Sequence, residues 1–413
     1  MMKYDYFAEY TFFSKREEQQ EKFQEEIVDL LACGNGRRDP TIDKFRDISD
    51  SFARVQLLAQ TNANTQKKQE DNRKENKDGR AKKKVRECLP RLYKNIFSES
   101  FFAARKNLIK DLGLEPASPP SERIPSQSWP LCLTFKLKKN YLSKDDSDFY
   151  PVDNPVRKEW VFKVPYIAAS QWKGNLRSVV IRELVADLQD GKLSEAQFFA
   201  KRQSLWRLFG NEKDGSGDFL NRALAIFRIE TASSDESQYK EWSEGIGNEA
   251  KKIGEDFLHQ LEGENLRNKD IDGYQGCLYF YPTYFNRIGL EAINPHSRLT
   301  GAGTHPIYLE CVPKDTEGTF NLLYAPFGGT TPESRMTDFD TVTDGVWAMM
   351  TTHGFGAKTS SGYGLANILD PSTGKPFALL DGFKEFCRSQ YPIDKEAGDS
   401  ATFDEEQRNG SHT

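Results

Sequence analysis

The chain has 413 residues, of which 37% are hydrophobic and 29% charged, and its formal net charge is −5 at pH 7. This length allows two or three domains, but the low hydrophobic content is enough for a packed core in only part of the chain. The acidic balance excludes a global nucleic-acid-binding charge, so any polyanion site must be a local patch. We find neither a signal-like segment nor an apolar run of membrane-spanning length and expect a cytoplasmic protein with no membrane association.

The first part of the chain, residues 1–127, predicts a charged helical region that is separate from the rest. A capping box that begins at Ser14 and a stop at Gly34 delimit a first helix, and a second is expected from Asp43 to about Gln60. The segment 67–86 is rich in lysine and arginine and almost free of apolar side chains. Its composition fits either a solvated, partly disordered linker or a mobile clamp on an RNA backbone.

A β-based core begins with residues 128–210. Apolar side chains alternate from Leu131 to Leu137, which predicts a strand, and a second short strand is expected at Trp160–Val164. Ser170 is the expected N-cap of a long helix, and a second helix follows a capping box at Ser194.

An insertion at residues 211–272, with a helical middle, separates this part of the core from its second part at 273–372. The strands predicted in the second part are Gly276–Pro282, Arg287–Ala292, Ile307–Val312 and Phe320–Ala325, and a helix is predicted at Asp344–His353. Residues 373–413 form a polar tail that is expected to fray beyond Leu380. Interleaved strands and helices predict an α+β fold with helices on one face of a mainly antiparallel sheet, and a ferredoxin-like (RRM-like) arrangement fits best.

An acidic loop precedes the first core helix. Its four aspartates are Asp145, Asp146, Asp148 and Asp153. Pro155 biases Asn154 away from helical dihedrals, so the neighbouring carboxylate of Asp153 is held on an extended or turning loop. Such a cluster either binds Mg²⁺ or only solvates the loop.

The helix after this loop begins with residues suited to an anion. Ser170 is followed by Lys173 and Arg177 within the first two turns. A helix N-terminus offers backbone N–H groups, and the two cations add positive potential, so this is a physically sensible place for a phosphate.

A glycine-rich segment near the C-terminal end is the second candidate for phosphate contact. It contains Gly354, Gly356, Gly362 and Gly364, together with Lys358. The spacing differs from a Walker loop and from a dinucleotide-binding fingerprint. Both a structural turn and a cradle of backbone amides around phosphate remain open.

These motifs, in this order, resemble the RAMP superfamily of CRISPR-associated proteins, in particular the backbone subunits of type III effector complexes. The resemblance covers residues 129 to about 370, less the insertion. The matching residues are Val152-Asp153-Asn154-Pro155-Val156, then Pro165-Tyr166-Ile167, Ser170, Lys173-Gly174 and Leu176-Arg177, and finally Gly354 to Gly364. The segment Gly276 to Tyr281 also looks like the family's strand after its second helix.

The resemblance implies a ferredoxin-like RAMP core that binds CRISPR guide RNA through its backbone and acts with target RNA and with other RAMP and signature subunits of a type III complex. It implies RNA contacts at Ser170, Lys173 and Arg177 and along the glycine segment with Lys358. In cleaving members, the aspartate at the position of Asp153 is required for metal-dependent cutting of target RNA. Mg²⁺ or another divalent cation is therefore the expected cofactor if this chain cleaves, and its ligands are unknown.

Two other readings of the resemblance remain. Asp153 could cap its turn in a non-catalytic RAMP subunit that spaces or caps the RNA-guided filament. A stand-alone guide-RNA-processing endoribonuclease would use a histidine base such as His296. The family usually has Pro-Gly-Ser-Ser-Leu where this chain has Ala168-Ala-Ser-Gln-Trp172, so we expect Trp172 to reshape the approach of phosphate.

Overall fold

The computed structural model describes residues 27–32, 45, 48, 51–66, 87–94, 99–114, 125, 127–145, 150–152, 154–211, 215–232, 239–263, 274–294, 307–326 and 330–390. Within these ranges, no helix has the length and the apolar character that crossing a membrane requires.

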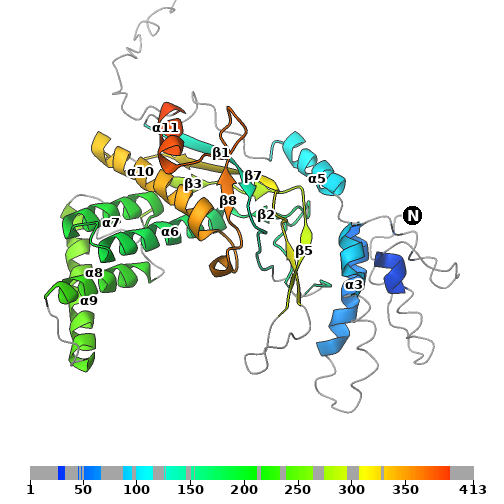
Figure 1. The fold of residues 1–413 in the computed structure, drawn as a ribbon, viewed down its shortest axis with the longest axis horizontal. Helices are drawn as coiled ribbons and strands as arrows, with labels where there is room; N and C mark the ends of the chain where they lie inside the picture. The colour runs from blue at the N-terminus through cyan, green and yellow to red at the C-terminus, as the bar shows by residue number, and fades with distance from the viewer. Residues whose placement is uncertain are drawn as a thin grey trace, which may run out of the picture.

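A four-stranded antiparallel sheet lies at the centre of the molecule (Figure 1). Its strands, in spatial order, are β3 (Leu278–Phe280), β7 (Glu317–Tyr324), β1 (Trp129–Leu137) and β8 (Ala366–Ile368). Burial alternates along β1, as in a strand with one face in the core: Leu131, Leu133 and Phe135 are buried, whereas Thr134 is exposed. The predicted α+β class with antiparallel sheet is confirmed.

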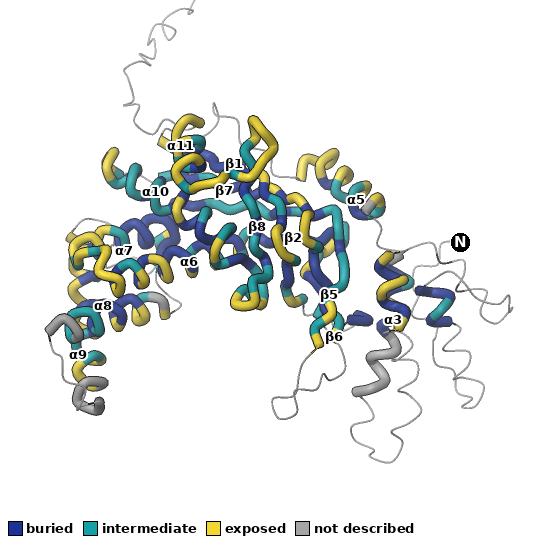
Figure 2. Tube along the Cα trace, viewed as in Figure 1, coloured by how far each residue is buried: buried dark blue, intermediate teal, exposed yellow. Residues whose placement is uncertain are grey.

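Helices cover the face of the sheet that Leu133 and Phe135 occupy. The helices that pack there are α6 (Ala169–Gln189) and α10 (Pro332–Ala348), with α7 (Glu195–Phe209) against both. The ring of Phe135 meets Trp172 of α6 edge to face at 5.9 Å, and that of Trp129 meets Phe339 of α10 at 5.1 Å. Figure 2 shows the burial concentrated where α6 and the sheet strands meet. In chain order the core elements run β1, α6, β3, β7, α10, β8.

The predicted strands of the second core part are present, and two small antiparallel pairs flank the main sheet. One pair consists of β5 (Gly289–Ile293) and β6 (Ile307–Cys311), and the other of β2 (Tyr166–Ile167) and β4 (Thr283–Tyr284). The strand expected at Trp160–Val164 is wrong, because residues 160–162 form a turn. The Glu159 carboxylate accepts hydrogen bonds from the backbone N–H groups of Val161 and Phe162, which bends the chain there.

The capping box predicted at Ser194 is confirmed. The Ser194 side chain accepts a hydrogen bond from the Gln197 backbone N–H, and the Gln197 side-chain oxygen accepts one from the Ser194 backbone N–H. The following segment contains two helices, α8 (Ser216–Ala232) and α9 (Tyr239–Gly263). Only the second was predicted. The segment leaves and rejoins the core at one point, because Gly210 and Gln275 form a β-bridge.

Side chains of the helical segments before β1 contact the core. The structure describes helical residues 27–32 and 87–94, α3 (Ser51–Gln66) and α5 (Glu99–Asp111). Their buried side chains belong to the same hydrophobic cluster as those of the sheet. Arg105 of α5 also donates a hydrogen bond to the Phe162 carbonyl at 3.0 Å. The basic segment 67–86, Ser14 and Gly34 lie outside the described residues.

The chain does not fray directly after Leu380, so that expectation is wrong for residues 380–390. Helix α11 (Leu380–Gln390) packs on the core through Phe383 and Cys387, both of which are buried. The Phe383 ring stacks at 5.7 Å on Trp347 of α10. The polar remainder, 391–413, lies outside the described residues.

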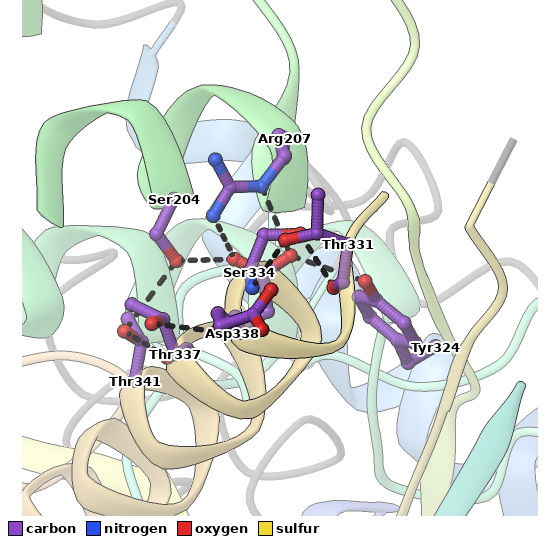
Figure 3. A network of polar contacts seen from close by, with 9 residues as sticks. Ser204, Arg207, Tyr324, Thr331, Ser334, Thr337, Asp338 and Thr341 are labelled. Atoms are coloured by element: carbon purple, nitrogen blue, oxygen red, sulfur yellow. Dashed lines mark hydrogen bonds and ion pairs between the residues drawn. The ribbon is translucent and has the colours of Figure 1, made fainter. Parts of the chain in front are cut away.

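A buried polar network fixes α7, β7 and α10 to one another (Figure 3). The fully buried Asp338 accepts hydrogen bonds from Ser204 at 2.6 Å, from Arg207 at 2.7 Å and from the Tyr324 hydroxyl at 3.1 Å. These contacts satisfy the buried Asp338 carboxylate and supply its ion-pair partner, Arg207.

Candidate functional site

The first turn of α6 carries the cationic helix start predicted from the sequence. Its N-cap is Ala168, which makes no side-chain capping bond, and the helix begins at Ala169. Ser170 is therefore inside the first turn, exposed, and the prediction that it is the N-cap is wrong. The N–H groups of Gln171 and Trp172 both donate to the Ala168 carbonyl, at 3.0 and 3.1 Å. The first two N–H groups of the helix, those of Ala169 and Ser170, are the ones that face solvent or a ligand when no side chain caps the helix.

Trp172 points into the core and away from any phosphate approach. It is 0% exposed, and its ring lies against Phe320 and Phe355 with centroids 5.0 and 4.7 Å away. Its Nε1 donates to the Thr283 hydroxyl at 3.0 Å, so the indole is both buried and satisfied. The expectation that Trp172 reshapes the phosphate-binding face is wrong.

Ser170, Lys173 and Arg177 come together on the outer side of α6, where they line one cavity of about 480 Å³. The other residues that line it are Gly174, Ser178, Ile181, Arg182, Gly215 and Phe219. Burial, and then repulsion from Arg177, lowers the pKa of Lys173 below its ordinary value. An anion in this cavity would relieve the repulsion between these cations.

A second cavity, of about 470 Å³, lies between α6 and α10 and has the opposite electrostatic character. Glu183, Asp187, Asp340 and Asp344 line it together with Lys201 and Lys384. Lys384 pairs with both Asp340 and Asp344, at 3.3 and 2.8 Å. Its excess of carboxylates makes it unsuitable for phosphate, so α6 has one face suited to a polyanion and one that would repel it.

The glycine segment follows α10 and a π-helical turn, Met349–His353. All four predicted glycines have positive φ angles, from 73 to 93°. At Gly364, an added Cβ would lie 1.9 Å from the Phe355 carbonyl oxygen, and at Gly356 one would lie 2.4 Å from the Leu142 carbonyl oxygen. These glycines are therefore needed for the close packing of the chain on itself, independently of any ligand.

The helix start and the glycine segment are joined through the core. Phe355 contacts Trp172, as described above, and Gly356 packs on the ring of Tyr141, whose hydroxyl is bonded to the Gln171 amide at 2.9 Å. None of the four glycines lines the cavity of Lys173 and Arg177. The start of α6 and the glycine segment are thus connected by buried side chains, but they do not line the same pocket.

Two lysines give the glycine segment positive charge. Lys358 is exposed and in the left-handed region, with φ of 58°. The Lys139 ammonium lies beside Gly362, where a Cβ would meet it at 2.7 Å. The segment is held to the loop after β1 by hydrogen bonds from Ala357 N to Leu142 O at 2.8 Å and from Gly364 N to Asn140 O at 2.9 Å.

Asp153, the predicted catalytic residue, lies outside the described residues, as do Asp146, Asp148, His296 and His305. Across the described ranges, no group of three or more His, Cys, Asp and Glu side chains is arranged to hold a metal ion.

The segments on either side of Asp153 are anchored to Glu310, which is fully buried in β6. Its carboxylate accepts hydrogen bonds from the Tyr150 hydroxyl and the Lys158 ammonium, both at 2.5 Å, and from the Val156 N–H at 2.8 Å. Tyr93, from the helical residues 87–94, also donates to it. Burial, together with the Glu310 charge, raises the pKa of both tyrosines well above the ordinary value. Glu310 therefore joins the N-terminal region to the acidic loop.

Three residues of this site were missed by the sequence reasoning. Arg182 could have been found, since it follows Ser178 by four positions and so continues the exposed stripe of α6. Lys139 follows β1 in sequence, and nothing in the pattern places it beside Gly362. Glu310 lies in an otherwise apolar strand, where a charged residue at a buried position is itself a signal.

No protein-family model matches this sequence, and no curated protein sequence matches it significantly. Among solved structures, the chain is similar to one in the type III-B Cmr-beta complex bound to cognate target RNA, with 15% identity, a TM-score of 0.41, and coverage of 84% of this chain and 97% of that one. It is also similar to Cmr6 from Pyrococcus furiosus, with 15% identity, a TM-score of 0.27, and coverage of 58% and 97%. A chain of apo Cmr-beta gives 9% identity, a TM-score of 0.31, and coverage of 60% and 99%.

Proposed function

We propose that this chain is a guide-RNA-binding RAMP subunit of a type III CRISPR effector complex, and that Asp153 serves metal-dependent cleavage of the target RNA. It would bind the guide through the RNA backbone and would adjoin other RAMP subunits in the complex. The guide, by base pairing, would read the target sequence.

The order of elements supports a ferredoxin-like core. A β-α-β-β-α-β unit of that type has two helices on one face of a four-stranded antiparallel sheet. The sequence β1, α6, β3, β7, α10, β8, with strand order β3-β7-β1-β8, follows this pattern.

The cationic cavity on α6 is the observation that carries the RNA-binding proposal. Lys173, Arg177 and Arg182 line it beside an uncapped helix start, and Ser170 adds a hydroxyl. A-form RNA is recognised mainly through phosphates and 2′-hydroxyl groups, which such a surface can bind without a high overall pI. Lys139 and Lys358 would extend the positive potential along the glycine segment.

The cleavage proposal rests on the position of Asp153 between two anchored segments. A carboxylate there could help to activate the 2′-hydroxyl that displaces the phosphate, or could bind a divalent cation. Carboxylate oxygens are ligands that Mg²⁺ prefers. We assign no further metal ligand, because most of the acidic loop lies outside the described residues.

Binding is tested by titrating fluorescent guide RNA with the wild-type chain and with a Lys173→Ala/Arg177→Ala variant. We expect weaker binding and a shallower dependence of log K on log salt, by about 0.7 for each phosphate contact that is lost. Lys252→Ala, which removes an exposed cation on α9, is the matched control and should bind as wild type does. Unchanged affinity of the double variant would contradict the proposed surface.

Cleavage is tested in the assembled complex with Asp153→Ala, and with Asp145→Asn as a control from the same loop. We expect Asp153→Ala to lose a target cut while it retains target binding, and Asp145→Asn to keep that cut. Cleavage that is unchanged at every site would make this chain a non-catalytic spacing or capping subunit.

A further inference from the structure

The turn between the acidic loop and α6 exposes a tryptophan. Trp160 is 82% exposed and its neighbour Val161 is 69% exposed. The backbone N–H of Tyr166 donates to the Arg157 carbonyl at 3.1 Å, and Lys158 and Pro165 form a β-bridge. Residues 157–166 are thus a short projection with an aromatic ring at its tip.

The projection is held in one shape. The Glu159 carboxylate accepts hydrogen bonds from Val161 N at 2.8 Å and from Phe162 N at 2.6 Å. Arg105 of α5 donates to the Phe162 carbonyl from outside the turn. A side chain at such a tip is pre-organised, so a ligand that contacts it pays little for ordering.

Cations accompany the aromatic rings of this projection. Lys163 has a φ of 56°, an unfavourable conformation for lysine, and its ammonium lies 4.4 Å from the centroid of the Trp160 ring. At the base, the Arg157 guanidinium lies 5.7 Å from the centroid of Tyr166, and that ring stacks on Tyr284 at 6.0 Å. The only carboxylate of the projection, Glu159, is already engaged by the backbone.

We propose that Trp160 is a stacking platform for an unpaired RNA base, with Lys163 placed to contact the phosphate next to that base. Exposed aromatic rings interleaved with cations are the features that bind single-stranded nucleic acid. A protein partner would need a larger exposed apolar surface than the Trp160 indole and the Val161 side chain offer. A single RNA base is about the size of an indole ring and can stack on it. The inference rests on the proposed RNA-binding function and names the part of the RNA that this segment contacts.

The test compares the affinity of full-length variants for a 12-nucleotide single-stranded RNA and for a blunt 12-base-pair RNA duplex, by fluorescence anisotropy. Trp160→Leu should weaken single-strand binding by roughly fivefold to a hundredfold, which is the loss of affinity expected when one base loses its aromatic stacking partner. Duplex binding should be unchanged. Trp160→Phe should retain part of the affinity. Val161→Ala, at the same tip, removes apolar area without an aromatic ring and should bind as wild type does.

Equal single-strand affinity of Trp160→Leu and wild type would overturn the platform. If that variant instead fails to assemble with other subunits, the tip is a protein contact, and the platform is overturned as well. The Lys173→Ala/Arg177→Ala variant separates the Trp160 platform from the proposed RNA-binding function. If that variant loses RNA affinity and Trp160→Leu does not, only the platform is rejected. If the wild-type chain binds neither RNA, both proposals are rejected.

Discussion

The indole of Trp172 and the phenyl ring of Phe355 lie with centroids 4.7 Å apart, which joins the first turn of α6 to the glycine segment. The two residues are 0% exposed. The outer face of this helix start and the glycine segment are therefore placed relative to one another by a rigid core contact.

Trp172→Ala should lower the free energy of unfolding by about 3–5 kcal/mol, because it removes a fully buried aromatic side chain and leaves a cavity. Trp172→Phe keeps the aromatic packing but leaves the Thr283 hydroxyl without the donor at 3.0 Å, and should cost less, about 1–2 kcal/mol. Urea unfolding of the three proteins measures both values. Equal stability of wild type and Trp172→Ala would contradict the core position of the ring.

Gly364→Ala should destabilise the protein by more than about 1 kcal/mol, since alanine is strained at φ of 73° and its Cβ would collide with the Phe355 carbonyl. Gly174→Ala is the matched control, because nothing lies within 4 Å of a Cβ there and the residue is inside α6. We expect this control to stabilise the protein by up to about 1 kcal/mol. Thermal unfolding distinguishes the two, and the same sign for both would refute the packing argument.

RNA binding should weaken at high pH through Lys173. Its pKa lies below the ordinary lysine value, so its positive charge is lost at lower pH than that of an exposed lysine. A bound phosphate favours the charged form and raises the pKa, so RNA binding takes up a proton and becomes weaker as pH increases. Anisotropy titrations with 2′-O-methyl RNA, which resists alkaline hydrolysis, measure the effect.

Lys173→Arg is the control for this titration, because a guanidinium stays charged throughout that range. It should flatten the pH profile. If wild type and Lys173→Arg show the same dependence on pH, Lys173 does not contact the RNA.

Glu310→Gln should destabilise the protein by about 3–5 kcal/mol, because it leaves the Lys158 ammonium, with a side chain only 6% exposed, without its counter-charge. Replacing both residues, as Glu310→Gln/Lys158→Met, should recover much of the loss. Limited trypsin digestion at Arg157 reports loosening of the loop and should be faster in the single variant than in the double. No recovery in the double variant would indicate that the tyrosine and backbone bonds, instead of the ion pair, carry the effect.

Strong local patterns in the sequence predicted much of the core. The alternation in β1 and the capping box at Ser194 are determined by side chains close in sequence, and the structure contains both. The turn at Trp160–Phe162 was mistaken for a strand because its apolar residues look like a buried strand, whereas a single carboxylate, Glu159, bends the backbone.

The residues of the candidate site could be predicted from the sequence only where they lie on the same helix or strand. Lys173 and Arg177 share a helix, so their spacing places them on one face. Glu310 meets Tyr93 and Tyr150 across 217 and 160 residues of sequence, and Lys139 meets Gly362 through packing of the two loops. Such contacts depend on the tertiary fold and have no local signal.

The backbones of Gly210 and Gly276 lie so close together that a Cβ on Gly276 would be 2.7 Å from the Gly210 nitrogen. The inserted segment that contains α8 and α9 therefore begins and ends at one junction with the core, where Gly210 and Gly276 meet. Because the two ends meet, closing this segment costs little chain entropy. Replacing the segment would nevertheless remove Gly215 and Phe219 from the cavity of Lys173 and Arg177 and would uncover the core around the buried Leu220 and Leu224.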